Sequence, residues 1–155
     1  MLMTILLALH IVAAVIWVGG MFFAYVILRP SIAGIEPAPE RPRLWRRVFE
    51  RFFLFVSISV VTLLLTGYAM IFGYFGGFAG VHVSVHIMHL LGLVMFAAYG
   101  HLRFAAWPKF RRAVDGEDFE EAGKRLNTIR TIVAVNLGLG WLTVIAGSTG
   151  RYWPI

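Results

Sequence analysis

The chain has 155 residues, of which 59% are hydrophobic and 14% charged, and its formal net charge is +6. So few polar side chains cannot cover a water-soluble globule of this size, and the composition therefore predicts an integral membrane protein. Cysteine is absent, which excludes disulfides, thiolate metal sites and thiol redox chemistry.

The distribution of charge predicts four transmembrane helices. Three stretches contain no Asp, Glu, Lys or Arg: residues 1–28, 52–102 and 131–150. The middle stretch is long enough for two passes around the glycine-rich segment GYFGGFAG. Because a helix needs about 20 residues to cross the hydrocarbon, we expect helices near residues 3–28, 52–75, 81–103 and 129–149. The predicted fold class is all-α, a polytopic membrane four-helix bundle formed by a single domain, residues 1–155.

The basic residues predict the orientation of these helices. Six follow the first helix and seven follow the third, so thirteen of the fourteen lie on one side of the membrane and only Arg151 on the other. The positive-inside rule places both termini on the periplasmic side of a bacterial inner membrane. No nucleic-acid partner is expected, because the arginines flank membrane segments and no recognition module is present. The first connection is proline-rich and is expected to lie along the cytoplasmic surface, whereas the second is expected to extend the fourth helix.

Histidine is concentrated in the segment VHVSVHIMH, residues 81–89, which contains three of the five histidines. His82, His86 and His89 are spaced i, i+4, i+7, so they share one helix face, which we expect to look toward the first helix. His10 and His86 lie at similar depths, each about 9 to 11 Å below the outer surface at 1.5 Å per residue. His101 is expected at the cytoplasmic interface.

Imidazoles inside a membrane are functional candidates because burying them without partners is costly. The structural alternative is hydrogen bonding between helices. Neutral imidazole suits haem iron, copper and zinc, but a structural zinc site would close four ligands. We therefore predict haem b, with His10 and His86 as axial ligands and His89 in reserve.

The remaining candidate residues would shape the haem slot and its rim. Trp17 is expected to pack against the haem ring, and Gly20 is expected to let the edge of the haem ring pass close to the helix backbone. Haem propionates turn to the aqueous rim, where we expect Arg151 and His82. The alternative for Arg151 is a solvated charge near the C-terminus.

Two segments carry a resemblance to a known family. ALHIVAAVIWVGGMFF, residues 8–23, resembles the first-helix signature of CopD-like membrane proteins, a histidine followed by W-x-G-G, and NLGLGWLTVIAGSTG, residues 136–150, is similar to the short four-helix members. The chain more distantly resembles the HemJ-type protoporphyrinogen oxidases, whose third-helix histidine aligns with His86. That family has a lysine where Met88 stands here, which argues against porphyrinogen oxidation but not against haem ligation, and a HemJ-like protoporphyrinogen oxidase is the further alternative.

The resemblance implies two classes of function. HemJ-like proteins bind haem b and act as redox enzymes, so one prediction is electron transfer or a small oxidoreductase with a bis-histidine haem near the outer face. The CopD name implies copper, so the alternative is copper binding or copper transport. Met88 is a soft Cu(I) ligand, yet it faces about 160 to 200° away from His86 around the helix. Expected partners are the lipid bilayer and a redox protein or quinone, and a homo-oligomer stays open.

Overall fold

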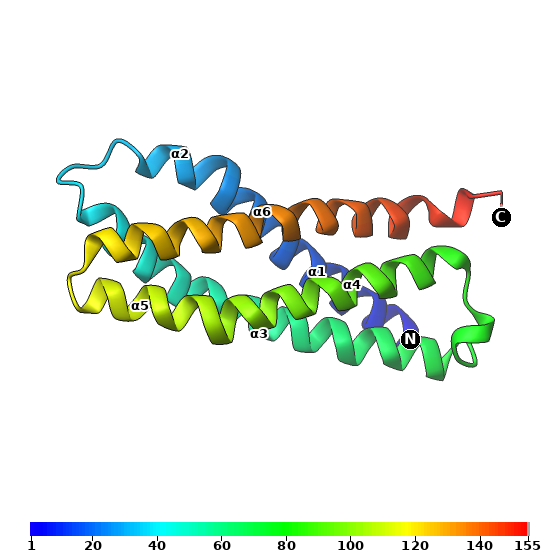
Figure 1. Cartoon of the computed structure of the whole chain (residues 1–155). Helices are drawn as coiled ribbons and strands as arrows, with labels where there is room; N and C mark the ends of the chain where they lie inside the picture. Colours follow the sequence, from blue (N-terminus) through cyan, green and yellow to red (C-terminus); the bar gives the residue numbers. More distant parts are fainter. Residues whose placement is uncertain (155) are drawn as a thin grey trace.

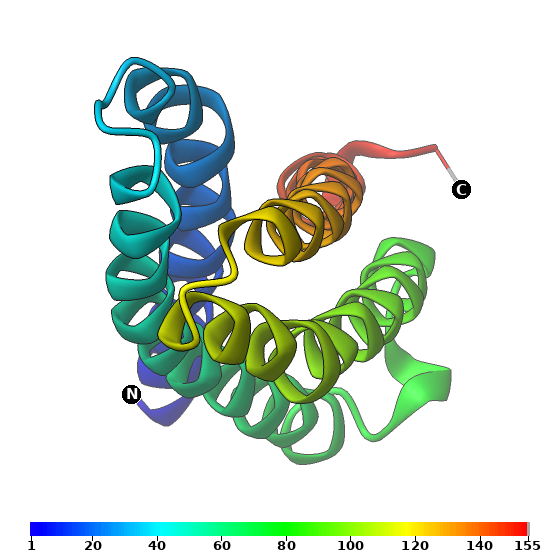
Figure 2. The same cartoon turned by 60° about the vertical axis from the view of Figure 1, so that its left-hand side comes forward.

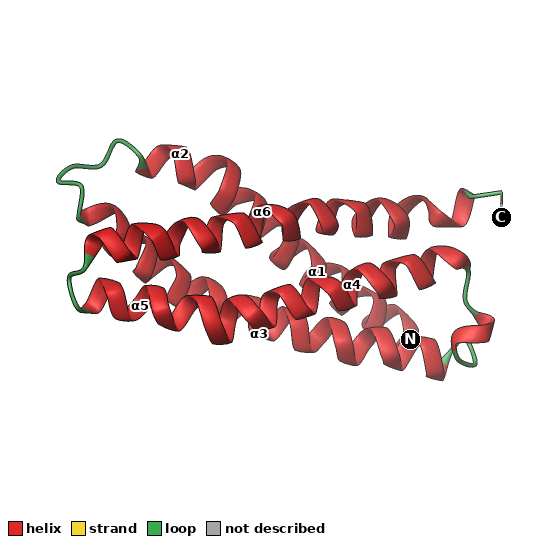
Figure 3. Cartoon of the chain, in the orientation of Figure 1, coloured by secondary structure: helices red, strands yellow, loops and turns green. Residues whose placement is uncertain are grey.

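The computed structural model describes residues 1–154 and consists of helices connected by short loops (Figures 1 and 3). Four continuous helical segments in this part of the chain are long and apolar enough to cross a membrane. Their bounds are Leu2–Ile32, Glu40–Gly73, Val83–Asp115 and Phe119–Tyr152. The all-α prediction is therefore confirmed.

The segments subdivide into labelled elements. The first contains α1 (Leu2–Phe22) and α2 (Arg29–Ile32), the second is α3 (Glu40–Gly73), the third contains α4 (Val83–His101) and α5 (Trp107–Asp115), and the fourth is mainly α6 (Phe119–Thr149). A short 3-10 turn, Phe78–Gly80, lies between α3 and α4. A second one, Gly150–Tyr152, follows α6.

The helices extend well beyond the expected spans at one end of the bundle, and most of the first connection is helical. α3 begins at Glu40, although the sequence predicted a surface segment as far as residue 51. The second connection is helical through α5 and the start of α6, as expected. Together these segments carry thirteen of the fourteen basic residues, and this end of the bundle is called the basic end. Both chain termini lie at the opposite end (Figure 1).

Two of the long segments widen into a π-helix before a proline. Residues Phe23–Leu28 precede Pro30, and Leu102–Ala106 precede Pro108. Proline has no N–H to donate and its ring crowds the preceding turn, and a π-helical turn absorbs that mismatch without ending the helix. The helices therefore continue past both prolines toward the basic end.

The helices pack mainly in two pairs, α1 on α3 and α4 on α6. Figure 2 shows α6 running between the α1 and α3 pair and the long α4–α5 segment. Glycines bring the backbones of the second pair close together: a Cβ at Gly150 would lie 2.2 Å from the Cβ of Ser84. Small residues at such crossings are typical of membrane helices, which gain packing contacts rather than hydrophobic burial when they associate.

The buried aromatic core lies toward the basic end. Phe49 is 3% exposed and its ring contacts those of four other aromatic residues. These neighbours are Trp45, Phe53, Trp107 and Phe110. They come from α3 and α5, so the core fixes the α3–α5 crossing. The first eleven residues of α1, by contrast, include no buried side chain.

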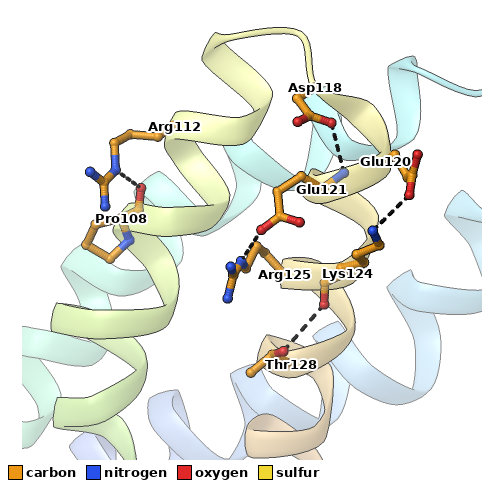
Figure 4. A network of polar contacts seen from close by, with 8 residues as sticks. All are labelled: Pro108, Arg112, Asp118, Glu120, Glu121, Lys124, Arg125 and Thr128. Carbon is orange, nitrogen blue, oxygen red and sulfur yellow. Dashed lines mark hydrogen bonds and ion pairs between the residues drawn. The ribbon is translucent and has the colours of Figure 1, made fainter.

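Ion pairs and caps order the outermost turns of the basic end. Asp118 caps α6 by accepting a hydrogen bond from the Glu121 N–H at 3.0 Å, the start of a capping box. Glu120 and Glu121 each pair with a basic residue one turn later, as Figure 4 shows. Pairs between helices also form here, including Arg46 with Asp115 at 2.6 Å.

Candidate metal centre

His10 lies on α1 and is held by α3. Its Nδ1 atom lies 2.8 Å from the Thr66 hydroxyl oxygen, and that hydroxyl lies 2.6 Å from the carbonyl oxygen of Thr62. A hydroxyl has a single proton, and the short contact to a carbonyl, which can only accept, uses it. The Thr66 oxygen must then accept from the Nδ1–H of His10. This fixes the tautomer and leaves the lone pair on Nε2 for a ligand.

Gly67 gives the His10 ring its place. A Cβ at this position would lie 3.3 Å from Cε1 of His10, tighter than ordinary van der Waals contact. The absence of a side chain therefore lets the imidazole settle on the α3 backbone, next to the hydroxyl that orients it. Two consecutive residues of α3, Thr66 and Gly67, thus position the His10 ring.

His89 lies on α4 and also contacts α3. Its Nε2 atom is 3.0 Å from the Tyr68 hydroxyl, and its ring centre is 4.9 Å from that of Phe78. His86, one turn earlier, is exposed and its ring lies 6.1 Å from the same Phe78. The sequence predicted that this histidine face would look toward the first helix. The structure instead places His89 against α3.

The two hydroxyls come from the same turn of α3. Thr66 and Tyr68 are two residues apart, which is about 3 Å along the helix axis but on opposite sides of it. His10 and His89 therefore lie at one depth, with α3 between them. The end of the bundle that contains His10, His86 and His89 is called the histidine end.

His82 and Arg151 lie at the rim of the histidine end. His82 is the N-cap of α4, where its Nδ1 accepts from the Ser84 N–H at 3.3 Å. This gives it a structural role that the sequence reading did not foresee. Arg151 is exposed and its guanidinium lies 4.8 Å from the ring centre of Tyr152.

Trp17 and Gly20 lie deeper, in the contacts between helices. Trp17 is 3% exposed, and its ring is stacked 5.5 Å from that of Phe96 and packed edge-on against Tyr99. A Cβ at Gly20 would lie 2.9 Å from the ring of Phe52, so this glycine allows α1 to approach α3. Both positions have packing roles that are independent of any bound group.

The methionines of α4 face α6 rather than the histidines. A Cβ at Gly147 would lie 3.1 Å from the sulfur of Met88, and one at Gly140 would lie 3.3 Å from the terminal methyl of Met95. The expectation that Met88 points away from the histidine face agrees with this placement. The two methionines are seven residues apart and so share a face, a pairing that the sequence analysis did not identify.

Among residues 1–154, no three His, Asp or Glu side chains approach closely enough to share one metal ion. A tetrahedral structural zinc site is therefore not formed by these side chains. His101 is exposed where α4 ends, away from the other histidines along the helix. The chemistry available is that of separate imidazoles, of which His10 and His89 each contact a hydroxyl of α3.

The sequence reading missed Thr66 and Tyr68. The available signal was their position, because they are polar residues in the middle of an apolar span. A hydroxyl in such a span needs an acceptor or donor from a neighbouring helix, or from its own backbone one turn earlier. Which histidine each would meet depends on helix pairing, and this could not be read from hydropathy.

Comparison with known proteins gives one match. A family model described as copper resistance protein D matches residues 46–149. The matched region begins within α3 and ends at the last residue of α6, so it includes His86, His89 and both hydroxyl residues but not His10. The chain matches no curated protein and no solved structure.

Proposed function

Because the chain belongs to the copper resistance protein D family, we propose that it is a membrane protein that binds copper ions as cargo at the histidine end of its bundle. His10 on α1 would bind one ion, and the pair His86 and His89 on α4 would bind another, because α3 lies between the two positions. Imidazole nitrogen is a suitable copper ligand. No carboxylate lies in these parts of the helices to compete for the ion.

The hydrogen bond between His10 and Thr66 is the observation that carries this proposal. Histidines that bind metals commonly donate their second ring N–H to a neighbouring acceptor, which fixes the tautomer and raises the basicity of the ligating nitrogen. Nδ1 of His10 is engaged in this way, 2.8 Å from the Thr66 oxygen. The metal would then bind at Nε2.

His86 and His89 would form the second copper site. They are one turn apart on α4 and both lie against Phe78. His86 lies nearer the start of α4 than His89, so an ion arriving from the histidine end would reach it first, while His89 is half-buried against Tyr68. This order supports stepwise transfer from His86 to His89.

Copper binding by the purified protein tests the proposal. The variants His10→Ala and His89→Ala should each weaken copper binding about tenfold or more, measured by competition with a chromogenic chelator in detergent. His101→Ala is the matched control, because it removes an exposed histidine outside the site, and should bind like the parent protein. Equal affinities in all four proteins would refute the proposal.

Haem b is the second candidate, because imidazole is also an axial ligand of haem iron. The sequence predicted His10 with His86 or His89 as the axial pair, but α3 lies between His10 and His89, so a haem would be held from one side of α3, by His10 or by the α4 histidines. The group would supply one-electron transfer. Trp17 was expected to line the haem-binding cleft, but its ring is packed against that of Phe96, so other residues would have to line such a cleft. A Soret band in the purified protein, lost in His10→Ala but kept in His101→Ala, would favour haem over copper.

The orientation is also proposed: the histidine end faces the periplasm of a bacterial inner membrane. The thirteen basic residues of the two connections lie at the other end, and such charge asymmetry sets topology. A reporter enzyme active only outside the cytoplasm should work when fused after residue 155 and be silent when inserted near Gly116. The opposite pattern would place copper uptake on the cytoplasmic side.

A further inference from the structure

A pocket at the basic end is separate from the histidines and has a distinct chemistry. Its volume is about 770 Å³, and it lies where the π-helical turn and α2 meet the starts of α3 and α6. Its polar side chains include three arginines and one phenol: Arg29, Arg41, Arg130 and Tyr25. No Asp or Glu lines it, and its remaining walls are mainly aliphatic and aromatic.

Two of these arginines have no acidic partner among the described residues. Of the eight acidic side chains, seven form ion pairs with other basic residues and Asp118 caps α6. Arg41 is one of the paired residues, with Glu36. Arg29 and Arg130 form no ion pair, although like charges that line one pocket repel each other.

Each of the two guanidiniums lies over an aromatic ring. The Cζ atom of Arg29 is 5.0 Å from the ring centre of Tyr25, and that of Arg130 is 5.8 Å from that of Trp45. A cation–π contact uses the charge of the guanidinium and no particular N–H group, so these groups remain donors for hydrogen bonds. The Nε atom of Arg130 is buried without a hydrogen-bond partner. The terminal nitrogens of Arg130 also form no hydrogen bond among the described residues but are not buried, so they are the donors that a ligand in the pocket can reach.

The size and walls of the pocket identify the class of ligand. A water molecule occupies about 30 Å³ in the liquid, so the volume of the pocket is many times that of a small free anion. Its aliphatic walls, which include Val26 and Leu126, continue into the apolar helices. An acidic phospholipid matches both the charge and the apolar lining of this pocket. Its phosphate can accept hydrogen bonds from the arginines, and its acyl chains can pack against the aliphatic side chains. Basic pockets between membrane helices bind such headgroups.

We propose that this pocket binds the headgroup of an acidic phospholipid, with Arg29 and Arg130 as the phosphate-binding residues and Tyr25 as a further donor. This site goes beyond the copper function and is independent of it. The bound phosphate, which carries one negative charge, attracts both cations and offsets part of their mutual repulsion, and so joins α1, through its extension, to α6. The lipid thereby stabilises the crossing of these two helices at the basic end.

Native mass spectrometry of the purified protein tests this proposal with phosphatidylglycerol and phosphatidylcholine as probes. The parent protein should bind phosphatidylglycerol at least tenfold more tightly than phosphatidylcholine. The double variant Arg29→Gln/Arg130→Gln should lose that preference. The control Arg47→Gln/Arg111→Gln removes the same charge from two exposed arginines outside the pocket and should keep it.

The outcomes separate the pocket from simpler explanations. Equal loss of preference in both double variants would overturn the proposal in favour of diffuse attraction to the basic end. If millimolar inorganic phosphate displaced phosphatidylglycerol, the ligand of the pocket would be a free phosphate ion and the proposal of a lipid headgroup would be wrong. The variant Arg29→Lys/Arg130→Lys keeps both charges, and should retain part of the preference because an ammonium group binds phosphate as a point charge. Its complete loss of preference while folded would also contradict the proposal.

Discussion

The two ends of the bundle are built in different ways. The basic end joins its helices through a buried aromatic cluster and through ion pairs such as Arg46 with Asp115. The histidine end has few buried side chains in α1, and polar contacts such as those of His10 with Thr66 and His89 with Tyr68 connect its helices. The aromatic cluster itself is closely packed, and the pocket lined by Arg29 and Arg130 lies outside it. The contrast indicates that buried apolar contacts hold the helices of the basic end together, whereas single polar contacts connect those of the histidine end.

Removing one aromatic ring should show the largest difference between the ends. Phe49→Ala deletes a side chain that is 3% exposed within the aromatic cluster, so we expect a loss of about 3 to 5 kcal/mol in the free energy of unfolding. Leu9→Ala, at the histidine end, changes a side chain that is 49% exposed and should cost less than about 0.5 kcal/mol. Unfolding by sodium dodecyl sulfate in mixed micelles measures both. Similar losses would show that the ends are equally packed.

The sequence predicted the four membrane helices and the separation of basic residues from histidines, because both follow from local composition. It did not predict that α3 begins at Glu40, because a segment rich in proline and arginine is typical of a connection at the membrane surface. A proline in the first turn of a helix is tolerated, as Pro42 shows.

The contacts of the histidine end could be predicted only in part. The spacing predicted one helix face for His82, His86 and His89, but only His86 and His89 lie within α4 and against Phe78, because His82 is the extended N-cap residue. The spacing also did not predict the direction of this face. Helix pairing decides the direction, and that depends on close approaches at glycines such as Gly20 and Gly150. Periodicity does not show which helix a small residue will meet. The role of Thr66 was hidden for the same reason.

The orienting hydroxyl of Thr66 should have the next largest effect, on copper binding rather than on folding. Thr66→Val keeps the size of the side chain but removes the acceptor of the His10 Nδ1–H bond, and should weaken copper binding about 10-fold to 100-fold. Thr66→Ser retains the hydroxyl and should bind nearly as tightly as the parent protein. Chelator competition measures both variants. If valine and serine gave the same affinity, Thr66 would have only a packing role.

The hydroxyl of Tyr99 tests the region between the two ends. It lies 2.6 Å from the Ser57 hydroxyl and 3.1 Å from the Phe53 carbonyl oxygen, and so connects α4 to α3. Hydrogen bonds between membrane helices average about 0.6 kcal/mol, so Tyr99→Phe should cost about that much in unfolding free energy. Ser57→Ala should cost a similar amount, and the double variant less than the sum, because the two share one bond. A fully additive double variant would contradict this connection.

The smallest effect is expected for the ion pair between α3 and α5. Arg46 and Asp115 are partly exposed, and their shortest contact is 2.6 Å. Exposed pairs contribute about 0.2 to 1 kcal/mol, so Asp115→Asn should reduce the unfolding free energy within that range at low salt. At about 1 M salt the screening length falls to about 3 Å, and the difference between the variant and the parent protein should largely vanish. Phe49→Ala, which removes apolar contacts, should keep its full effect at both salt concentrations. A salt-independent loss for Asp115→Asn would mean that the carboxylate acts through local hydrogen bonding at the end of α5 rather than through its charge, and the aromatic cluster alone would then hold the basic end of α3 against α5.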